Sequence, residues 1–331
     1  MTDYVATAEP VGSHLIASHY ELGVRSATIR SELAELSDLG YLRQPHTSAG
    51  RIPSDLGYRF YVDRLMGAAM LPRSEAVRAS RRLVPRRTEM DIILEQTCQI
   101  LADLAHYTSM ATHPAVKEAS ISHISVASVG RRKLLIVLVL DTGRVVHELL
   151  DLRQDRGGLT PAKATSFLMR KVSGRALESA AAALAEPLHE PEAAMEELVG
   201  KVRAMIAREI ESAEQTQIQL GGTSYIMQQP EFKDVERLEA MLSVLEQRSA
   251  LYELFSSVYV GPEVTVIIGS ENPVREMQDC SFVGTKYRIG GRVAGTIGIL
   301  GPTRMDYHRA TAAVQFMAAN LGDLLTRLSV A

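Results

Sequence analysis

The sequence predicts an α+β multidomain protein that begins with a winged helix-turn-helix and continues with a β-rich unit interrupted by a helical block. Near the N-terminus, two short helical patterns joined by a glycine-containing turn precede a strand–loop–strand pattern. Further along, strand-like runs gather in two groups, 122–151 and 264–300, and long amphipathic stripes lie between them. The 331 residues are enough for two or three domains with a sizeable core.

The first element is a short helix that begins near Ser13, whose hydroxyl can cap a helix N-terminus. Gly23 lies in the tight turn that follows and can adopt the left-handed backbone conformation. A second helix is predicted over 26–39, with apolar residues at helical spacing on one face, and Gly40 ends it. In a helix-turn-helix the second helix enters the major groove of DNA, so we expect its first turns to reach base edges.

A strand–loop–strand pattern follows this second helix. Residues 41–44 predict a strand, 45–50 a polar loop and 51–53 a short return strand, and Ser54 is expected to cap a helix over 55–65. A hairpin in this position is a wing. Basic side chains on a wing are suited to contact phosphates or the minor groove.

The charge of the chain is unevenly distributed. The whole chain has a net charge of −3, but the segment from Val11 to Arg87 contains twelve arginines and seven carboxylates, a net charge of +5. This segment has no lysine, and the first lysine of the chain is Lys117. A basic segment on a mildly acidic protein suggests that one domain binds a polyanion, although a solvated basic surface would have the same composition.

Candidate DNA-binding residues follow from the helical pair and the wing. Those of the helical pair are Ser13, His14, Arg25, Ser26, Ala27, Thr28, Arg30 and Ser31. Those of the wing and the helix after it are Gln44, His46, Thr47, Ser48, Arg51 and Arg59. We expect the second group to touch the DNA backbone more than the bases. Arg30 could pair with a guanine through two hydrogen bonds, contact a phosphate or stay solvated, and the sequence leaves these alternatives open.

The remainder of the chain alternates between helical and strand-like segments, beginning with an Arg-rich linker over 71–88. The segments that follow are a helix over 89–111, strands over 122–129, 133–140 and 144–151, a helix over 160–172, an alanine-rich helix through Leu184, amphipathic stripes over 195–210 and 235–255, strands over 264–269, 280–288 and 295–300, and a helix over 306–328. Both stripes fall in the block 187–256, which we expect to be an insertion into the β-rich unit. Because so small an insertion has little of its own to cover the stripes, we expect it to dimerise.

The sequence shows no sign of export or of a membrane span. Met1 is followed by Thr2 and Asp3 without a basic or apolar leader. The longest apolar run, Leu134–Leu140, is too short to cross a bilayer. We therefore expect a cytoplasmic protein with no membrane partner.

The sequence also disfavours an enzyme. Cys98 and Cys280 lie far apart, match no metal-ligand spacing and are expected to be reduced, structural thiols. The histidines His106, His113 and His123 are not spaced as ligands on a helix face, and no carboxylate cluster accompanies them. We therefore expect no catalytic site, no metal and no cofactor.

Short sequence blocks along nearly the whole chain carry a further signal. The blocks are Glu9–Ser13, Ser26–Arg30, Leu39–Leu42, Gln44–Pro53, Gly57–Arg59, Tyr61–Leu65, Gln229–Phe232, Gly269–Pro273, Met277–Ser281 and Gly298–Tyr307. In this order they resemble the HrcA-type heat-inducible transcription repressors of bacteria. Several blocks in the same order are far more specific than any one of them. His14, Arg25 and Ser31 depart from the residues expected at their positions, so the register of individual base contacts stays open while the mode of binding does not.

The resemblance implies three domains and a regulatory function. The domains are a winged helix over 1–70, a GAF-like domain formed by 89–186 and 257–331, and a dimerisation domain inserted over 187–256. The implied function is negative regulation of chaperone operons, with a homodimer bound to an inverted repeat in double-stranded DNA upstream of them. A chaperonin would keep the repressor active until heat diverts it to unfolded proteins. The alternative is a metabolite-responsive repressor that senses a small ligand through the GAF-like domain, although no residue identifies such a ligand.

The start of the sequence carries one more expectation. Only Met1–Ala8 precede the block Glu9–Ser13, and residues 4–6 resemble the tail of a helix. A helix-turn-helix needs a further helix packed across the other two, because those two alone cannot cover their apolar faces. We therefore expect the coding sequence to begin upstream of Met1. A natural shortening of the first helix is the alternative.

Overall fold

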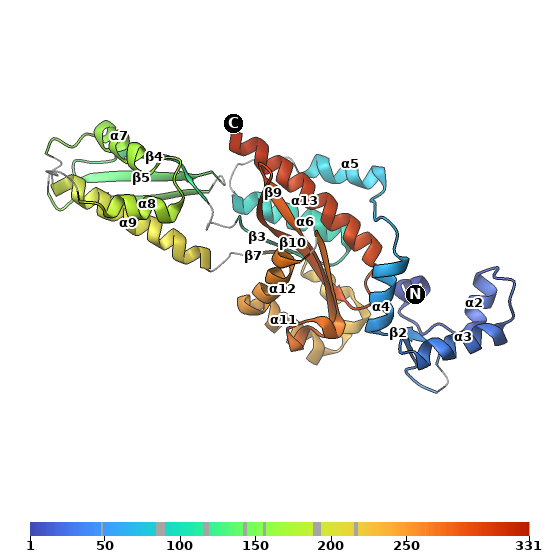
Figure 1. Ribbon diagram of the computed structural model, residues 1–331. Helices are drawn as coiled ribbons and strands as arrows, with labels where there is room; N and C mark the ends of the chain where they lie inside the picture. The colour runs from blue at the N-terminus through green and yellow to red at the C-terminus, as the bar shows by residue number, and fades with distance from the viewer. Residues whose placement is uncertain are drawn as a thin grey trace.

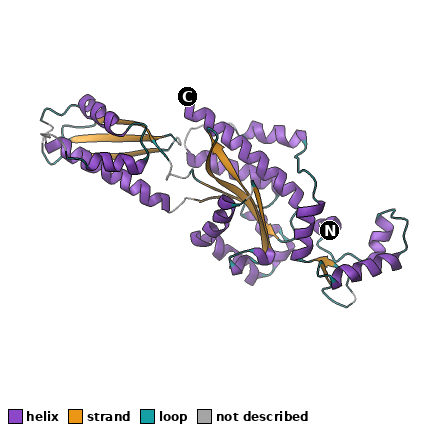
Figure 2. Cartoon of the chain, in the orientation of Figure 1, coloured by secondary structure: helices purple, strands orange, loops and turns teal. Residues whose placement is uncertain are grey.

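The chain folds into three units that lie in a row, with the central one formed by two separate segments of the chain (Figure 1). A computed structural model describes every residue apart from Ser48, 84–89, 115–118, 142–143, 155–156, 188–192, 215–217, Pro262 and Ala331. The units are an N-terminal unit (residues 1–70), a central body (71–114 and 218–330) and an inserted unit (119–214). Each unit contains both helices and strands, as expected of an α+β protein (Figure 2).

The N-terminal unit consists of short helices and one short hairpin. Its elements are α1 (Thr2–Thr7), α2 (Ser13–His19), α3 (Ser26–Asp38), β1 (Leu42–Arg43), β2 (Ile52–Pro53), α4 (Asp55–Phe60) and a π-helical turn, η1 (Tyr61–Leu65). Gly23, between α2 and α3, has a φ of +69°, and Gly40, after α3, has a φ of +81°. Both glycines adopt the left-handed conformation that the predicted turn and helix end require.

The core of the N-terminal unit is small. Its buried apolar residues are Val11, Ile29, Ile52 and Tyr58. The exposed apolar residues of α2, α3 and the segments beside them are Leu15, Leu22, Val24, Leu36 and Leu39. So little burial makes this unit depend on its neighbours for stability.

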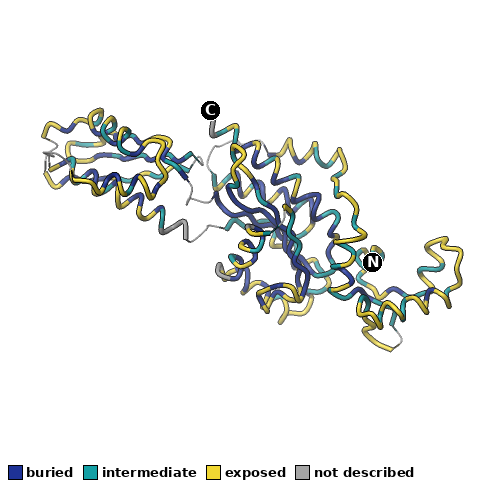
Figure 3. The backbone as a smooth tube through the Cα atoms, viewed as in Figure 1, coloured by how far each residue is buried: buried dark blue, intermediate teal, exposed yellow. Residues whose placement is uncertain are grey.

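The central body is a five-stranded antiparallel sheet between two helical layers. In sheet order its strands are β7 (Ile218–Gly221), β3 (Thr108–Thr112), β10 (Arg292–Pro302), β9 (Cys280–Ile289) and β8 (Val264–Ile268). One face shares a hydrophobic core with α6 (Met90–Ala105) and α13 (Tyr307–Val330). The other face packs against α11 (Val235–Glu246) and α12 (Arg248–Val260). The central strands are consequently buried on both faces (Figure 3).

Shorter elements complete the central body. They are α5 (Arg73–Arg82), α10 (Ser224–Gln228) and the 3-10 helices η3 (Pro230–Lys233), η4 (Gly269–Glu271) and η5 (Arg275–Met277). Of these, η4 follows β8 directly and lies beside α4 of the N-terminal unit, since the Asp55 carboxylate accepts a hydrogen bond from the Ser270 backbone N–H.

The inserted unit is a three-stranded antiparallel sheet with helices on one face. Its elements are β4 (Ile121–Ser128), β5 (Lys133–Leu140), β6 (Val145–Asp151), α7 (Pro161–Val172), α8 (Leu177–Ala185) and α9 (Ala193–Glu214). Alternate residues of β5, such as Ile136 and Leu138, pack with all three helices in one core. The unit leaves and rejoins the central body at neighbouring strands, because Thr112 of β3 lies opposite Ile218 of β7.

The structure corrects the predicted domain boundaries. The first amphipathic stripe belongs to α9, whose Leu198, Val202 and Ile206 are buried against the three-stranded sheet. The second stripe belongs to α11 and α12, which pack on the central sheet. The insertion is therefore 119–214 and not 187–256, and the strands of 122–151 do not join the sheet of 264–300. Helical spacing shows which face of a helix is buried, but it carries no information about what buries it.

The predicted helix over 89–111 is also partly wrong. It ends as α6 at Ala105, where His106 has a φ of +59°, and the chain continues as β3. All five residues of β3 are buried, because the strand lies between β7 and β10 with helices on both faces. A strand buried on both faces lacks the alternation that distinguishes a strand in sequence.

Candidate DNA interface

The first two turns of α3 form an exposed surface beside the turn between α2 and α3. Ile29 points inward and is only 7% exposed, whereas Ala27, Thr28, Arg30 and Ser31 are exposed. Arg25 occupies the N-cap position with an extended backbone, and its side chain does not cap the helix. The arrangement leaves the N-terminus of α3, which carries a partial positive charge, free to face an anion.

Two of the predicted contact residues serve partly to join the helices. The hydroxyls of Ser13 and Ser26 lie 3.1 Å apart, and both residues are half-buried. Ser13 is the first residue of α2 and Gly12 is its N-cap, so the predicted cap is displaced by one residue. His14 is exposed. The serine pair fixes the start of α2 against the start of α3, which sets the angle at which α3 is presented.

The wing loop is organised by one of its own side chains. The Gln44 amide donates from Nε2 to the carbonyl oxygens of Thr47 and Ala49, at 2.9 Å each. This closes the loop on itself and leaves His46 and Thr47 exposed. Ser48 lies outside the described residues. The Gln44 amide nitrogen is therefore used within the loop, whereas the side chains of His46 and Thr47 are exposed to a partner.

Arg51 ties the wing to the helical pair. Its backbone exchanges two hydrogen bonds with Val11, at 2.9 and 2.8 Å, and its Nε donates to the Ser37 hydroxyl of α3 at 2.9 Å. The side chain is half-buried. Arg51 thus has a structural role that the sequence did not reveal, because Ser37 lies fourteen residues away in the chain.

Arg59, which the sequence predicts to touch the DNA backbone, is bonded to the central body in the structure. Its guanidinium group pairs with both carboxylate oxygens of Glu271, at 2.8 and 2.5 Å, and donates to the Val266 carbonyl at 2.6 Å. A further bond reaches Asp63 at 3.2 Å. These acidic partners raise the pKa of Arg59. The side chain therefore joins α4 to the central body and has little left to offer a phosphate.

A cap and a close contact place α4 behind the hairpin. The Ser54 hydroxyl accepts from the Gly57 backbone N–H at 3.1 Å and donates to the Gly40 carbonyl at 2.6 Å. A side chain at Gly57 would clash with the Tyr41 carbonyl oxygen. The predicted cap is confirmed, and it binds the end of α3, the hairpin and α4 together.

The exposed arginines give this unit its basic character. Arg25, Arg30 and Arg43 are exposed, and among the described residues none of their guanidinium groups has a hydrogen-bond or ion-pair partner. Unpaired guanidinium groups beside an exposed helix N-terminus suit phosphates and guanine edges.

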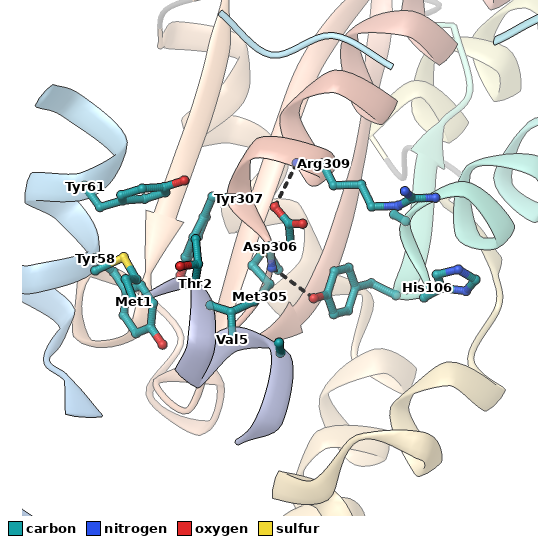
Figure 4. A pocket seen from close by; sticks show the side chains of 13 residues that line it. Met1, Thr2, Val5, Tyr58, Tyr61, His106, Met305, Asp306, Tyr307 and Arg309 are labelled. Atoms are coloured by element: carbon teal, nitrogen blue, oxygen red, sulfur yellow. Dashed lines mark hydrogen bonds between the residues drawn. The ribbon is translucent and has the colours of Figure 1, made fainter. Parts of the chain in front are cut away.

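A cavity of about 360 Å³ lies where the N-terminal unit meets the central body (Figure 4). Its walls come from α1, α4, η1, the end of α6 and the start of α13. The Tyr107 hydroxyl accepts from the Asp306 backbone N–H at 3.0 Å. The Tyr58 hydroxyl is buried and has no hydrogen-bond partner among the described residues, and burial raises the pKa of Tyr58, which keeps it protonated.

The described residues offer no centre for metal or thiol chemistry. Nowhere in that part of the chain do three His, Cys, Asp or Glu side chains come together as a metal site needs. Cys98 and Cys280 are buried free thiols, and burial raises the pKa of each to about 12, so both stay protonated. Of the described helices, none has the length and apolar character needed to cross a membrane.

Comparison with known proteins decides the family. A family model described as the HrcA protein C terminal domain matches residues 91–311. A relative from Desulforamulus reducens, named heat-inducible transcription repressor HrcA, is 36% identical over 98% of this chain and 94% of its own. The chain belongs to the HrcA family. It is therefore a DNA-binding transcription repressor of the heat-inducible class and not an enzyme, as the sequence predicted.

Other similarities agree with this membership. The HrcA repressor of Carboxydothermus hydrogenoformans is 37% identical over 98% of this chain and 94% of its own. A crystal structure of a hypothetical protein, solved at 2.2 Å resolution, has 20% identity and a TM-score of 0.62 over 98% of this chain and 95% of its own. At that identity the solved structure supports the fold alone.

Proposed function

We propose that this HrcA-family chain is a cytoplasmic repressor that binds, as a homodimer, an inverted repeat in double-stranded DNA upstream of chaperone operons. Residues 1–70 would act as a winged helix, with α3 in the major groove and the hairpin β1–β2 on the backbone. The observation that carries the proposal is the exposed start of α3, where the guanidinium groups of Arg25 and Arg30 have no partner among the described residues. Occupying the promoter would block transcription.

Roles within the interface follow from exposure and pairing. Thr28, Arg30 and Ser31 would face base edges, because all three are exposed near the start of α3. Arg25, His46 and Thr47 are placed for phosphates. The serine pair and Arg51 hold these elements in register, so their effect on affinity would come mostly through position.

The proposed dimer surface is the uncovered face of the inserted sheet. Most apolar residues of the two stripes first expected to dimerise are buried within the chain. On β6 and β5, Leu149 lies opposite Leu135 and Val145 lies opposite Val139, on the face away from α7, α8 and α9. Leu149 is 59% exposed. A second copy of the same face is self-complementary across a two-fold axis, which an inverted repeat also has.

Substitution on that face tests the dimer. Leu149→Asp should give a monomer by light scattering and weaken operator binding, because a charge would have to be buried between the two copies. Val260→Asp is the matched control, since Val260 is 89% exposed on α12 of the central body. A Leu149→Asp chain that stays dimeric would move the interface away from the sheet.

We also propose that a chaperonin maintains the active repressor. The exposed leucines of the N-terminal unit and its small core are the features of a domain that needs assistance to stay folded. The test measures binding to chaperone-operon promoter DNA with and without chaperonin, at rising temperature. Equal binding in both series would remove the chaperonin from the proposal.

The junction cavity supports a second candidate, a metabolite-responsive repressor. The cavity is large enough for a small molecule, and the buried Tyr58 hydroxyl could bond to it. The cavity lies between units and not within the central sheet and its helices. A thermal-shift screen with metabolites, repeated on Tyr58→Phe, tests this candidate, and a hit whose shift depends on Tyr58 would favour it over chaperonin control.

A further inference from the structure

The N-terminal unit is attached to the central body by side chains from one face of α4. Asp55 and Arg59 are four residues apart and therefore project from the same side of the helix. The Asp55 carboxylate accepts from the Ser270 backbone N–H at 2.9 Å. Arg59 makes the two-pronged pair with Glu271 and the bond to the Val266 carbonyl described above. Two charged residues of α4 thus form hydrogen bonds with the end of β8 and with the turn η4.

The segment that α4 contacts is also held by hydrogen bonds of its own. Glu271 Oε2 accepts from the Ile268 backbone N–H at 2.9 Å, so the carboxylate is held by its own turn. Gly269 has a φ of +49°, and a side chain there would clash with the Asp55 carboxylate. Both features limit the orientations in which α4 can pack against η4.

A second connection joins α1 to the central body beside the cavity, which Val5 lines. The Arg304 guanidinium pairs with Glu231 at 2.6 Å and also donates to the Val5 carbonyl at the end of α1. Between the two connections the rings of Tyr58 and Tyr307 pack with centroids 5.5 Å apart. Contacts at separated points oppose rotation of the N-terminal unit, which a single contact would allow.

We infer that the contact between α4 and η4 orients α3 within the dimer and so sets which half-site spacing the repressor accepts. This inference rests on the proposed binding of an inverted repeat. Two recognition helices must lie about one turn of DNA, roughly 34 Å, or a multiple of it apart. Any rotation of the N-terminal units about their attachment would change that separation. We therefore treat as positioning residues Arg59, Glu271 and Asp55, which would affect DNA binding through the orientation of α3 and not through contact with the bases.

The experiment compares Arg59→Gln and Glu271→Gln with the wild-type chain on inverted repeats whose central spacer is changed by one or two base pairs. Single half-sites are titrated in parallel. Spacer discrimination is the Kd on the altered repeat divided by the Kd on the optimal repeat. In both variants this ratio should fall about fivefold, which is the effect expected from losing one partly exposed charged pair. Their half-site Kd should stay unchanged. Arg64→Gln is the matched control, because it removes an exposed arginine of η1 that lies off this contact.

Each outcome separates this inference from its alternatives. If Arg59→Gln weakens half-site binding while Glu271→Gln leaves the half-site Kd unchanged, Arg59 contacts DNA directly and the inference is overturned. A rise in operator affinity in both variants would mean that the contact holds the N-terminal unit away from DNA, which also overturns it. If the wild-type chain itself shows no preference between repeats and half-sites, the proposed function fails, independently of this contact. Unchanged melting temperatures confirm that the variants fold.

Discussion

Arg30 and Arg51 carry the same charge in the same unit, yet their surroundings differ. Arg30 is exposed, whereas Arg51 is half-buried and bonded to Ser37. If Arg30 reads a base, Arg30→Ala should weaken specific binding by roughly 1–3 kcal/mol and relax preference at one position per half-site. Arg51→Ala should weaken binding to all sequences alike and also lower the free energy of unfolding by about 1 kcal/mol, because a hydrogen bond between α3 and the wing is lost.

Titrations on operator and scrambled DNA at several salt concentrations, with urea unfolding in parallel, measure both effects. Equal losses on the two DNAs for Arg30→Ala would place Arg30 on a phosphate. A salt dependence flattened by Arg51→Ala would show that its terminal nitrogens contact phosphate as well as supporting the wing.

The two buried thiols should make the folded chain less stable at alkaline pH. Burial raises the pKa of Cys98 and Cys280 to about 12, from an ordinary value near 9. The unfolded chain therefore loses these protons first, so the free energy of unfolding should fall as the pH rises from about 9 towards 12. At pH 8 a thiol reagent should react with the native chain only as fast as it unfolds. Rapid labelling of either cysteine in the native chain would contradict the burial.

At the scale of elements, the N-terminal unit depends on the cap of α4. Ser54→Ala removes the cap and the bond to Gly40, and should lower the free energy of unfolding by about 1 kcal/mol. Gly57→Ala should cost more, because the new methyl group clashes with the Tyr41 carbonyl oxygen. Ser74→Ala in α5 is the control, since that exposed serine makes no cap. If Ser54→Ala unfolds like the wild-type chain in urea, the cap contributes nothing to stability.

At the scale of the molecule, the inserted unit should be separable. Because Thr112 and Ile218 are opposite each other in neighbouring antiparallel strands, replacing 115–217 with a short turn would connect β3 and β7 as a hairpin. The shortened chain should fold, become monomeric by light scattering because the proposed dimer surface is gone, and bind half-sites without discriminating between repeats. A shortened chain that stays dimeric would place the interface on the central body, and one that fails to fold would show that the units share stability.

The sequence by itself determined the local elements and the family. The turn glycines, the Ser54 cap, the second helix and the hairpin could be read from residues a few positions apart, because capping and left-handed backbone are local requirements. The exposed candidates at the start of α3 were predicted for the same reason. The first amphipathic stripe identified the buried face of α9, and the second was right at Met241, Leu245 and Phe255 but not at Val235 and Leu242, which are exposed.

Only the tertiary structure decided what those faces pack against and which charges are already paired. Most of the two stripes is covered within the chain, and the insertion spans 119–214 instead of the predicted 187–256. The proposed dimer surface is therefore the uncovered face of the inserted sheet. β3 and β7 were missed because their burial comes from distant strands and helices. Arg59 meets Glu271, 212 residues away in the chain. Such pairings depend on how the whole chain folds back on itself, and no pattern of neighbouring residues records that.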